Sequence, residues 1–244
     1  MRLQDLAAVG PFFALRTGDS PGGAPGEPAE LAEPGWLPLA GPAVRLRVDT
    51  VAARLATDDR RAAASIAFQG IAGRVLSIAL GSAVLTGSVP DLAMDGLRWH
   101  PGRTAPDDLW LPRPAALVLT GDGARQIAAT VLRGTLVPLH IAFQAEVPIS
   151  ARLLWGNAGS ALAGAARVLH DWCTGQGRPA QAERTLDLTR SLLDDELLRG
   201  TGTLGPAGAF TRRGCCLYYR VPGGGTCGDC VLRHPPAQRP TAAM

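Results

Sequence analysis

Four of the five cysteines lie within residues 215–230, near the C-terminal end, and this clustering constrains the chain more than any other feature. Cys215, Cys216, Cys227 and Cys230 form the pattern C-C-x10-C-x2-C. A disulfide framework would spread its cysteines through a short secreted chain, whereas grouped thiols are typical of a metal site in a reducing compartment. The pattern therefore predicts one four-thiolate metal site, built by loops at the end of the chain.

The spacing inside this group bears on the identity of the metal. Cys227 and Cys230 have chelate spacing, in which a tight turn at Gly228 lets both sulfurs reach one metal. Cys215 and Cys216 are adjacent, and neighbouring side chains of an extended chain point to opposite sides, so they cannot easily chelate one ion. A [2Fe–2S] cluster is wider and tolerates such a pair better, so it is favoured, and a structural zinc site stays open.

Charged residues beside the cysteines are candidates for tuning this cluster. Arg212 and Arg213 precede the first pair, and Arg220 lies between the two pairs. Because thiolate and sulfide ligands make the cluster anionic, these arginines are expected to favour its reduced form, and Asp229 to oppose them. The alternative is that all four side chains only solvate a surface loop.

Composition and charge exclude several classes of protein. Apolar residues make up 46% of the chain, enough for a substantial core, and a formal net charge of +3 argues against a nucleic-acid binder. The first residues lack the apolar core of a signal peptide. The most apolar region, 62–90, is interrupted by Gln69 and Arg74, which leaves less than the roughly 20 residues of a membrane span. We expect a cytoplasmic protein, and peripheral association with the inner face of the cell membrane stays open.

Apolar spacing predicts an α+β fold that is mostly helical, with a small antiparallel sheet and a loop-built C-terminal appendage. The Gly- and Pro-rich segment 18–43 is predicted to be irregular, and Asp49 to cap a short helix. We expect a main domain over 1–205 and a [2Fe–2S]-binding segment over 206–244. The predicted helices span 50–57, 58–85, 124–133, 135–145, 150–172 and 181–198, and the predicted strands span 97–100 and 115–119.

The cysteine segment also carries a resemblance to a known family. Residues 212–234, RRGCCLYYRVPGGGTCGDCVLRH, resemble the C-terminal motif of the FhuF family of ferric-siderophore reductases, which is defined by this cysteine pattern. Upstream, Trp155-Gly156-Asn157 and residues 135–138 are similar to segments of that family, so the resemblance covers about half of the chain. It implies that the four cysteines ligate a [2Fe–2S] cluster that passes one electron to a ferric siderophore in the cytoplasm.

The implied reaction needs an electron donor but no acid, base or nucleophile. Hard oxygen chelators hold Fe(III) better than Fe(II), so one electron loosens the complex. We identify no dinucleotide-binding fingerprint, so the donor is expected to be ferredoxin-like or flavin-dependent. Two rival hypotheses are a zinc-stapled structural protein with four cysteines and a siderophore-binding accessory protein without redox activity.

Several further residues have a structural and a functional interpretation. Trp155 and Asn157 either contact the chelate or support the cluster, or else Trp155 packs at a helix interface and Asn157 makes a structural hydrogen bond. Cys173 is expected to be a buried or half-buried free thiol rather than a fifth ligand. The remaining candidates are histidines: His100, His140 and His170 show no metal spacing, and His234 would be a ligand only in a zinc site.

Overall fold

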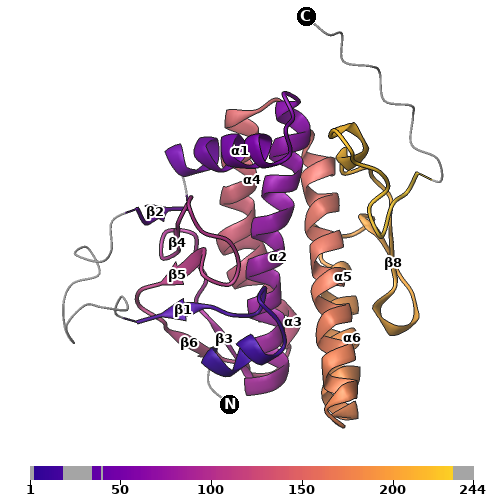
Figure 1. Ribbon diagram of the computed structural model, residues 1–244. Helices are drawn as coiled ribbons and strands as arrows, with labels where there is room; N and C mark the ends of the chain where they lie inside the picture. The colour runs from indigo at the N-terminus through magenta and orange to yellow at the C-terminus, as the bar shows by residue number, and fades with distance from the viewer. Residues whose placement is uncertain (1–2, 19–34, 40, 233–244) are drawn as a thin grey trace, which may run out of the picture.

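A computed structural model describes residues 3–18, 35–39 and 41–232 and confirms an α+β fold that is mostly helical (Figure 1). Most of the segment predicted to be irregular, 18–43, lies outside the described residues. The α-helices are α1 (Pro42–Arg54), α2 (Arg60–Thr86), α3 (Gly123–Ile127), α4 (Val137–Glu146), α5 (Ala151–Gly175) and α6 (Pro179–Leu193). The shorter helices are the 3-10 helices η1 (Leu3–Ala8), η4 (Pro206–Gly208) and η5 (Tyr218–Arg220) and the π-helix η3 (Ala128–Leu136).

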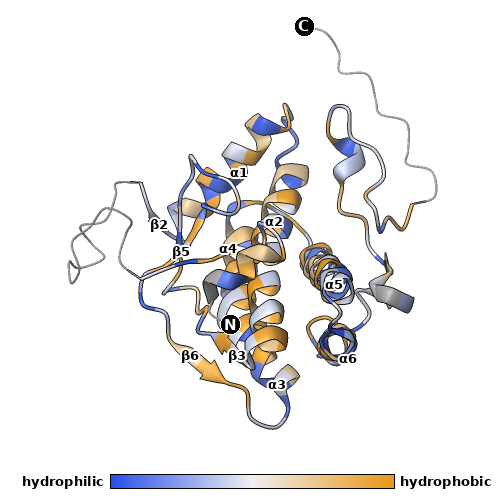
Figure 2. Ribbon diagram, turned by 60° about the horizontal axis from the view of Figure 1, so that its bottom comes forward, coloured by the Kyte–Doolittle hydropathy of each residue, from blue (hydrophilic) through white to orange (hydrophobic). Residues whose placement is uncertain are grey.

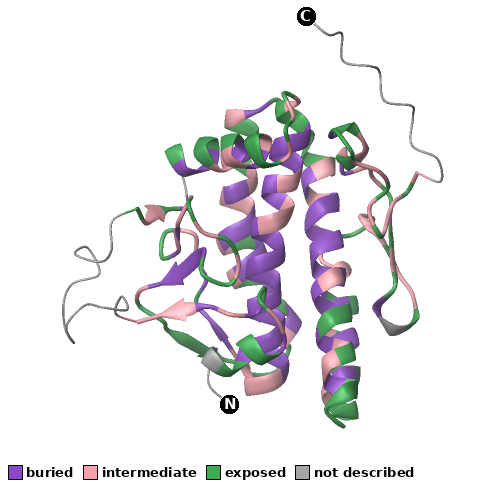
Figure 3. Ribbon diagram, viewed as in Figure 1, coloured by how far each residue is buried: buried purple, intermediate pink, exposed green. Residues whose placement is uncertain are grey.

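Helix α2 is the central element, and its ends match the sequence signals. Asp59 caps its N-terminus by accepting hydrogen bonds from the amides of Arg61 and Ala62, at 3.0 and 3.1 Å. Gly87 ends it in the left-handed conformation, with φ of 72°. Apolar and small residues occupy all sides of the helix, which suits a helix buried among neighbours (Figure 3).

Two helical stretches of the described chain are long and apolar enough to cross a membrane. They are Arg60–Thr86 and Gly123–Glu146, and 83% and 50% of their most apolar windows are buried inside the protein. Helix α2 packs against α1, α5 and α6, so its apolar surface serves as the protein core. Figure 2 shows the same distribution, with hydrophobic residues concentrated on the central helices.

Arg74 interrupts the apolar run of α2 and is nevertheless buried. Its Nε lies 3.2 Å from Oδ1 of Asp108, and its Nη1 and Nη2 donate to the carbonyl oxygens of Pro11 and Pro106, at 2.7 and 2.9 Å. A buried charge is costly unless it is paired and hydrogen-bonded, and here both conditions are met. The bond to Pro11 also fixes the N-terminal turn against α2.

Three small sheets lie around the helices in the described part of the chain. The largest has the order β1 (Arg16–Thr17), β5 (Leu109–Leu111), β4 (Arg98–Trp99) and β2 (Leu37–Pro38). Strands β1 and β5 pair in parallel, whereas all other pairs are antiparallel. The predicted strands 97–100 and 115–119 correspond to β4 and β6. The two remaining sheets pair β3 (Ser88–Pro90) with β6 (Ala116–Val118) and β7 (Gly202–Leu204) with β8 (Phe210–Arg212).

One predicted helix is wrong in its start. Helix α1 begins at Pro42, a residue suited to the first helical turn, so Asp49 lies inside the helix and caps nothing. Its carboxylate instead binds Nη1 of Arg60 at 2.6 Å. The helices predicted from 135, 150 and 181 are present as α4, α5 and α6, although Ser150, at the start of α5, makes no side-chain capping bond.

Helices α2 and α5 lie side by side and form the platform for the C-terminal segment (Figure 1). Helix α6 and the β7–β8 hairpin both pack against α5. The hairpin spans the predicted boundary between 205 and 206, and the division into two domains stays a prediction.

Replacing Asp59 by alanine is expected to lower the free energy of unfolding by about 1 kcal/mol, because the α2 cap is lost. Asp59 also pairs with Arg220 of the cysteine segment at 2.8 Å, but this pair is partly exposed and contributes little. Asp59→Asn keeps the cap and removes only the charge, so it should stay within roughly 0.5 kcal/mol of the wild type. Urea unfolding checks both values, and equal losses in the two variants would contradict the capping role.

Candidate metal centre

The C-terminal hairpin brings the two cysteine pairs near each other. Strand β8 ends at Arg212, three residues before the first pair. The amide of Arg212 donates to the carbonyl oxygen of Asp229 at 3.1 Å, which brings the second pair back beside the end of this strand. The amide of Arg213 donates to the carbonyl oxygen of Thr201 at 2.8 Å and ties the same point to the start of the hairpin.

Each cysteine pair forms a turn in which a backbone amide faces a sulfur. The amide of Leu217 donates to Sγ of Cys215 and that of Leu232 to Sγ of Cys230, both at 3.3 Å. The amide of Cys230 closes its turn on the carbonyl oxygen of Cys227 at 3.1 Å. Amides that donate to sulfur in this way stabilise negative charge on a ligating thiolate.

Cys216 and Cys227 connect the two pairs through their side chains. The Cys227 thiol donates a hydrogen bond to the Cys216 sulfur, which, with help from the amide of Tyr218 and the charge of Arg212, lowers the pKa of Cys216 to about 7. The same contact raises the pKa of Cys227. Since the thiolate is the form that binds metals, Cys216 is poised to ligate near neutral pH.

A buried polar chain connects these cysteines to α2 and α5. Nη1 of Arg212 lies 4.0 Å from Sγ of Cys227, and its Nη2 donates to Oδ1 of Asn157 on α5. Nδ2 of Asn157 donates to the carbonyl oxygen and Oγ of Ser65 on α2, at 2.9 and 2.8 Å. The Ser65 hydroxyl then donates to the carbonyl oxygen of Cys216 at 2.6 Å. This chain of hydrogen bonds is shielded from water, because its side chains are at most 1% exposed in Arg212, Asn157 and Ser65.

The donor set fits an anionic cluster with four thiolate ligands. All four cysteines are free, and Cys216 is 4% exposed. The buried Nε of Arg212 has no hydrogen-bond partner within the described residues, which leaves a positive donor beside Cys227. In the described ranges no three His, Cys, Asp or Glu side chains converge closely enough to hold an ion, so the fit rests on the donor chemistry.

The other predicted site residues lie outside the buried polar chain that leads to the cysteines. Trp155 is half-buried against the main core and stacks on His140, with ring centroids 5.2 Å apart. Arg213 is exposed, and Arg220 is paired with Asp59. Cys173 is a fully buried free thiol, as predicted, and burial raises its pKa. His234 lies outside the described residues.

Two features of this region differ from the sequence interpretation. Ser65 was not predicted, although a hydroxyl within the apolar run of α2 is a signal for a buried hydrogen bond. Residues 200–205 spell G-x-G-x-x-G, although no dinucleotide-binding fingerprint was predicted. They contain strand β7 and end just before the short helix η4. A dinucleotide site requires the glycines to lie between a strand and a long helix, so the pattern is not a fingerprint.

Comparisons with known proteins agree with this site. Residues 212–232 match the model of the FhuF 2Fe-2S C-terminal domain. The chain is 30% identical over 112 residues to a ferric siderophore reductase of Escherichia coli (strain K12). That match covers 43% of this chain and 40% of the length of the relative. The resemblance drawn from the cysteine pattern is therefore confirmed, and the chain is FhuF-like in its C-terminal cysteine segment.

Proposed function

We propose that this chain is a ferric-siderophore reductase of the cytoplasm that holds a [2Fe–2S] cluster on its four clustered cysteines. The observation that carries the proposal is the cysteine segment itself. Two of its thiols, Cys216 and Cys227, are in contact beside a buried arginine, in a segment that matches an iron–sulfur domain. The similarity to a protein named a ferric siderophore reductase supports the substrate. Clustered thiols stay reduced and able to bind metal in the cytoplasm, which supports the proposed compartment.

The residues of this protein would hold the cluster and stabilise its negative charge. When bound, a [2Fe–2S] cluster supplies one-electron transfer. The four thiolates would ligate it, and the amides of Leu217 and Leu232 would withdraw negative charge from the sulfurs of their pairs. The guanidinium of Arg212, 4.0 Å from Cys227, stabilises added negative charge because it is buried and poorly screened. Arg212 therefore favours the reduced form.

The reaction is a single-electron transfer to the bound iron of the substrate. A ferredoxin-like or flavin-dependent donor gives one electron, and the Fe(III) of the siderophore becomes Fe(II). Oxygen chelators bind Fe(II) more weakly, so the ferrous ion leaves for other ligands. No covalent bond to the protein forms, and the chain transfers no proton.

Anaerobically purified protein is expected to produce ferrous ion from a ferric hydroxamate siderophore when a chemical reductant and a ferrous trap are present. The rate should rise in proportion to protein concentration, because each chain carries one thiolate site. Absorbance of the trapped ferrous complex measures the rate, and the matched control is protein whose iron has been removed. A rate that is equal with and without bound iron would contradict the proposal.

A further inference from the structure

A groove runs along α2 and α5 and ends at the cysteine segment. It has a volume of about 840 Å³, within the range of roughly 300–1,000 Å³ that is typical of small-molecule sites. Its walls are the N-terminal turn, the facing sides of α2 and α5, and the cysteine segment, which contributes both Cys216 and Cys227. We call this space, lined by Phe12, Phe13, Gly73, Ser77, Gly164 and Tyr218 among others, the α2–α5 groove.

Ser77 on α2 offers a polar contact to a ligand in the groove. Its side chain lines the groove, although the residue is only 2% exposed. Its hydroxyl has no hydrogen-bond partner in the described part of the chain, unlike Ser65 and Ser160, which also lie between α2 and α5. The Ser77 hydroxyl is not one of the sealed, unpartnered polar atoms of the described residues, so it can exchange a water in the groove for a donor or acceptor of a bound molecule.

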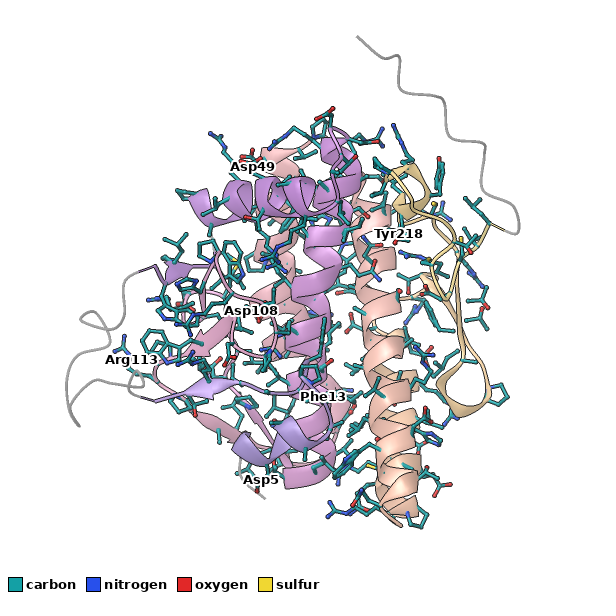
Figure 4. The ribbon with its side chains drawn as sticks, in the orientation of Figure 1. Asp5, Phe13, Asp49, Asp108, Arg113 and Tyr218 are labelled. Atoms are coloured by element: carbon teal, nitrogen blue, oxygen red, sulfur yellow. The ribbon has the colours of Figure 1, made fainter. Side chains whose placement is uncertain are left out.

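The charge of the lining restricts what the groove can hold. Arg167 and Asp229, of opposite sign, are its charged side chains, and Cys216 and Cys227 would add negative charge as thiolate ligands. Apart from Gln69, the remaining residues are small, apolar or aromatic, and Phe12 and Tyr218 are 43% and 36% exposed. Figure 4 labels Phe13 and Tyr218, which line the groove from the N-terminal turn and from the cysteine segment. Such a surface fits a compact ligand with little net charge and poorly fits a multiply charged anion.

We propose that the α2–α5 groove binds the ferric siderophore as a compact chelate of little net charge. The inference rests on the proposed reductase function, because it assigns the substrate of that reaction to this groove. The groove opens directly onto Cys216 and Cys227, so a chelate bound there lies beside two of the residues that would hold the cluster. Ser77 hydrogen-bonds the chelate, and the aromatic rings of Phe12 and Tyr218 cover its apolar part.

Gly164 offers a way to fill the groove without disturbing the fold. It lines the groove from α5, and a Cβ built on it meets no atom within 4 Å. Gly164→Leu therefore projects a side chain into the groove, and leucine is also the better helix former. Gly175→Leu is the matched control, because Gly175 lies on the same helix, is exposed and meets equally open space. It is about 16 Å further along α5, outside the groove lining.

The test measures binding of a gallium(III) tris-hydroxamate, which has the shape and charge of the ferric complex but is not reduced. We expect Gly164→Leu to weaken its binding by at least about tenfold and Gly175→Leu to leave it unchanged, as measured by calorimetry on the iron-loaded protein. Ser77→Ala should weaken binding severalfold, because the chelate loses its hydrogen bond. A gallium tris-catecholate, which carries three negative charges, should bind at least about tenfold more weakly than the hydroxamate complex.

The outcomes separate the groove from the reductase function. If Gly164→Leu binds the gallium chelate as the wild type does while ferric reduction persists, the groove assignment is wrong and the reductase function stands. If Gly164→Leu abolishes binding but the wild type reduces no ferric chelate, the groove is supported and the reductase function is wrong. Equal binding of the two gallium complexes overturns the assignment of ligand charge.

Discussion

Cys216→Ala protein, purified without oxygen, is expected to be nearly colourless and to lack most of the iron and acid-labile sulfide of the wild type. Cys216 is 4% exposed and contacts Cys227, so it lies where the two cysteine pairs meet. Its pKa of about 7 makes it readily available as a thiolate. Removing it leaves three thiolates for a group that requires four. Iron and sulfide analysis, with the visible absorption spectrum, measures the loss.

Cys173→Ala is the matched control for this experiment. Cys173 is also a buried free cysteine, but it lies in the last turns of α5, and burial raises its pKa, so it remains a protonated thiol. This variant should keep wild-type iron and sulfide. Equal iron in Cys216→Ala and the wild type would contradict the assignment of ligands. A wild-type protein that holds one zinc ion and no sulfide would instead establish the structural zinc site.

The cysteine site could be predicted from sequence because its ligands are close along the chain. Residues 215–230 contain all four thiols, and the hairpin that precedes them needs only local pairing. Asp59 as the cap of α2 was predictable for the same reason, since a capping residue acts on the amides that directly follow it. Asp49 shows the limit of this reasoning, because Pro42 started the helix earlier and left the carboxylate to Arg60.

The partners of the cysteine site could not be predicted, because they are brought together by packing. Ser65 and Asn157 are 92 residues apart, and Arg212 lies 55 residues beyond Asn157. The packing of α5 against α2 and against β8 places them on one buried path. The parallel pair β1–β5 is similar, since strands of two and three residues carry almost no sequence signal and join distant segments. Trp155 was named beside Asn157, yet it faces His140 on α4.

Asn157→Leu is expected to lower the free energy of unfolding by about 3 kcal/mol. Asn157 is fully buried and is the link between Arg212 and Ser65. Leucine has a similar volume, so little cavity is created, but Nη2 of Arg212 loses its acceptor and a buried charge is left poorly satisfied. We also expect iron retention to fall by about tenfold, because residues that orient metal ligands typically contribute that much to affinity. Urea unfolding and iron analysis measure the two effects.

Gln69→Leu is the matched control for Asn157→Leu. Nε2 of Gln69 donates to Oγ of Ser160 at 3.3 Å, so this variant also removes a polar bond between α2 and α5. It does not touch the polar chain that leads to the cysteines, and it should cost no more than about 1 kcal/mol and leave iron retention unchanged. Equal losses in the two variants would show that Asn157 only joins the helices.

Asn157→Asp separates the two halves of the polar chain. The aspartate keeps an oxygen for Arg212, and the bond becomes charge-assisted, but it cannot donate to Ser65. If Asn157 acts as a positioning residue through Arg212, iron retention in Asn157→Asp should recover most of the loss seen in Asn157→Leu. The added negative charge should at the same time lower the reduction potential, because it offsets the positive charge of Arg212. Recovery of stability without any change in potential would contradict a role for Arg212 in stabilising the reduced form.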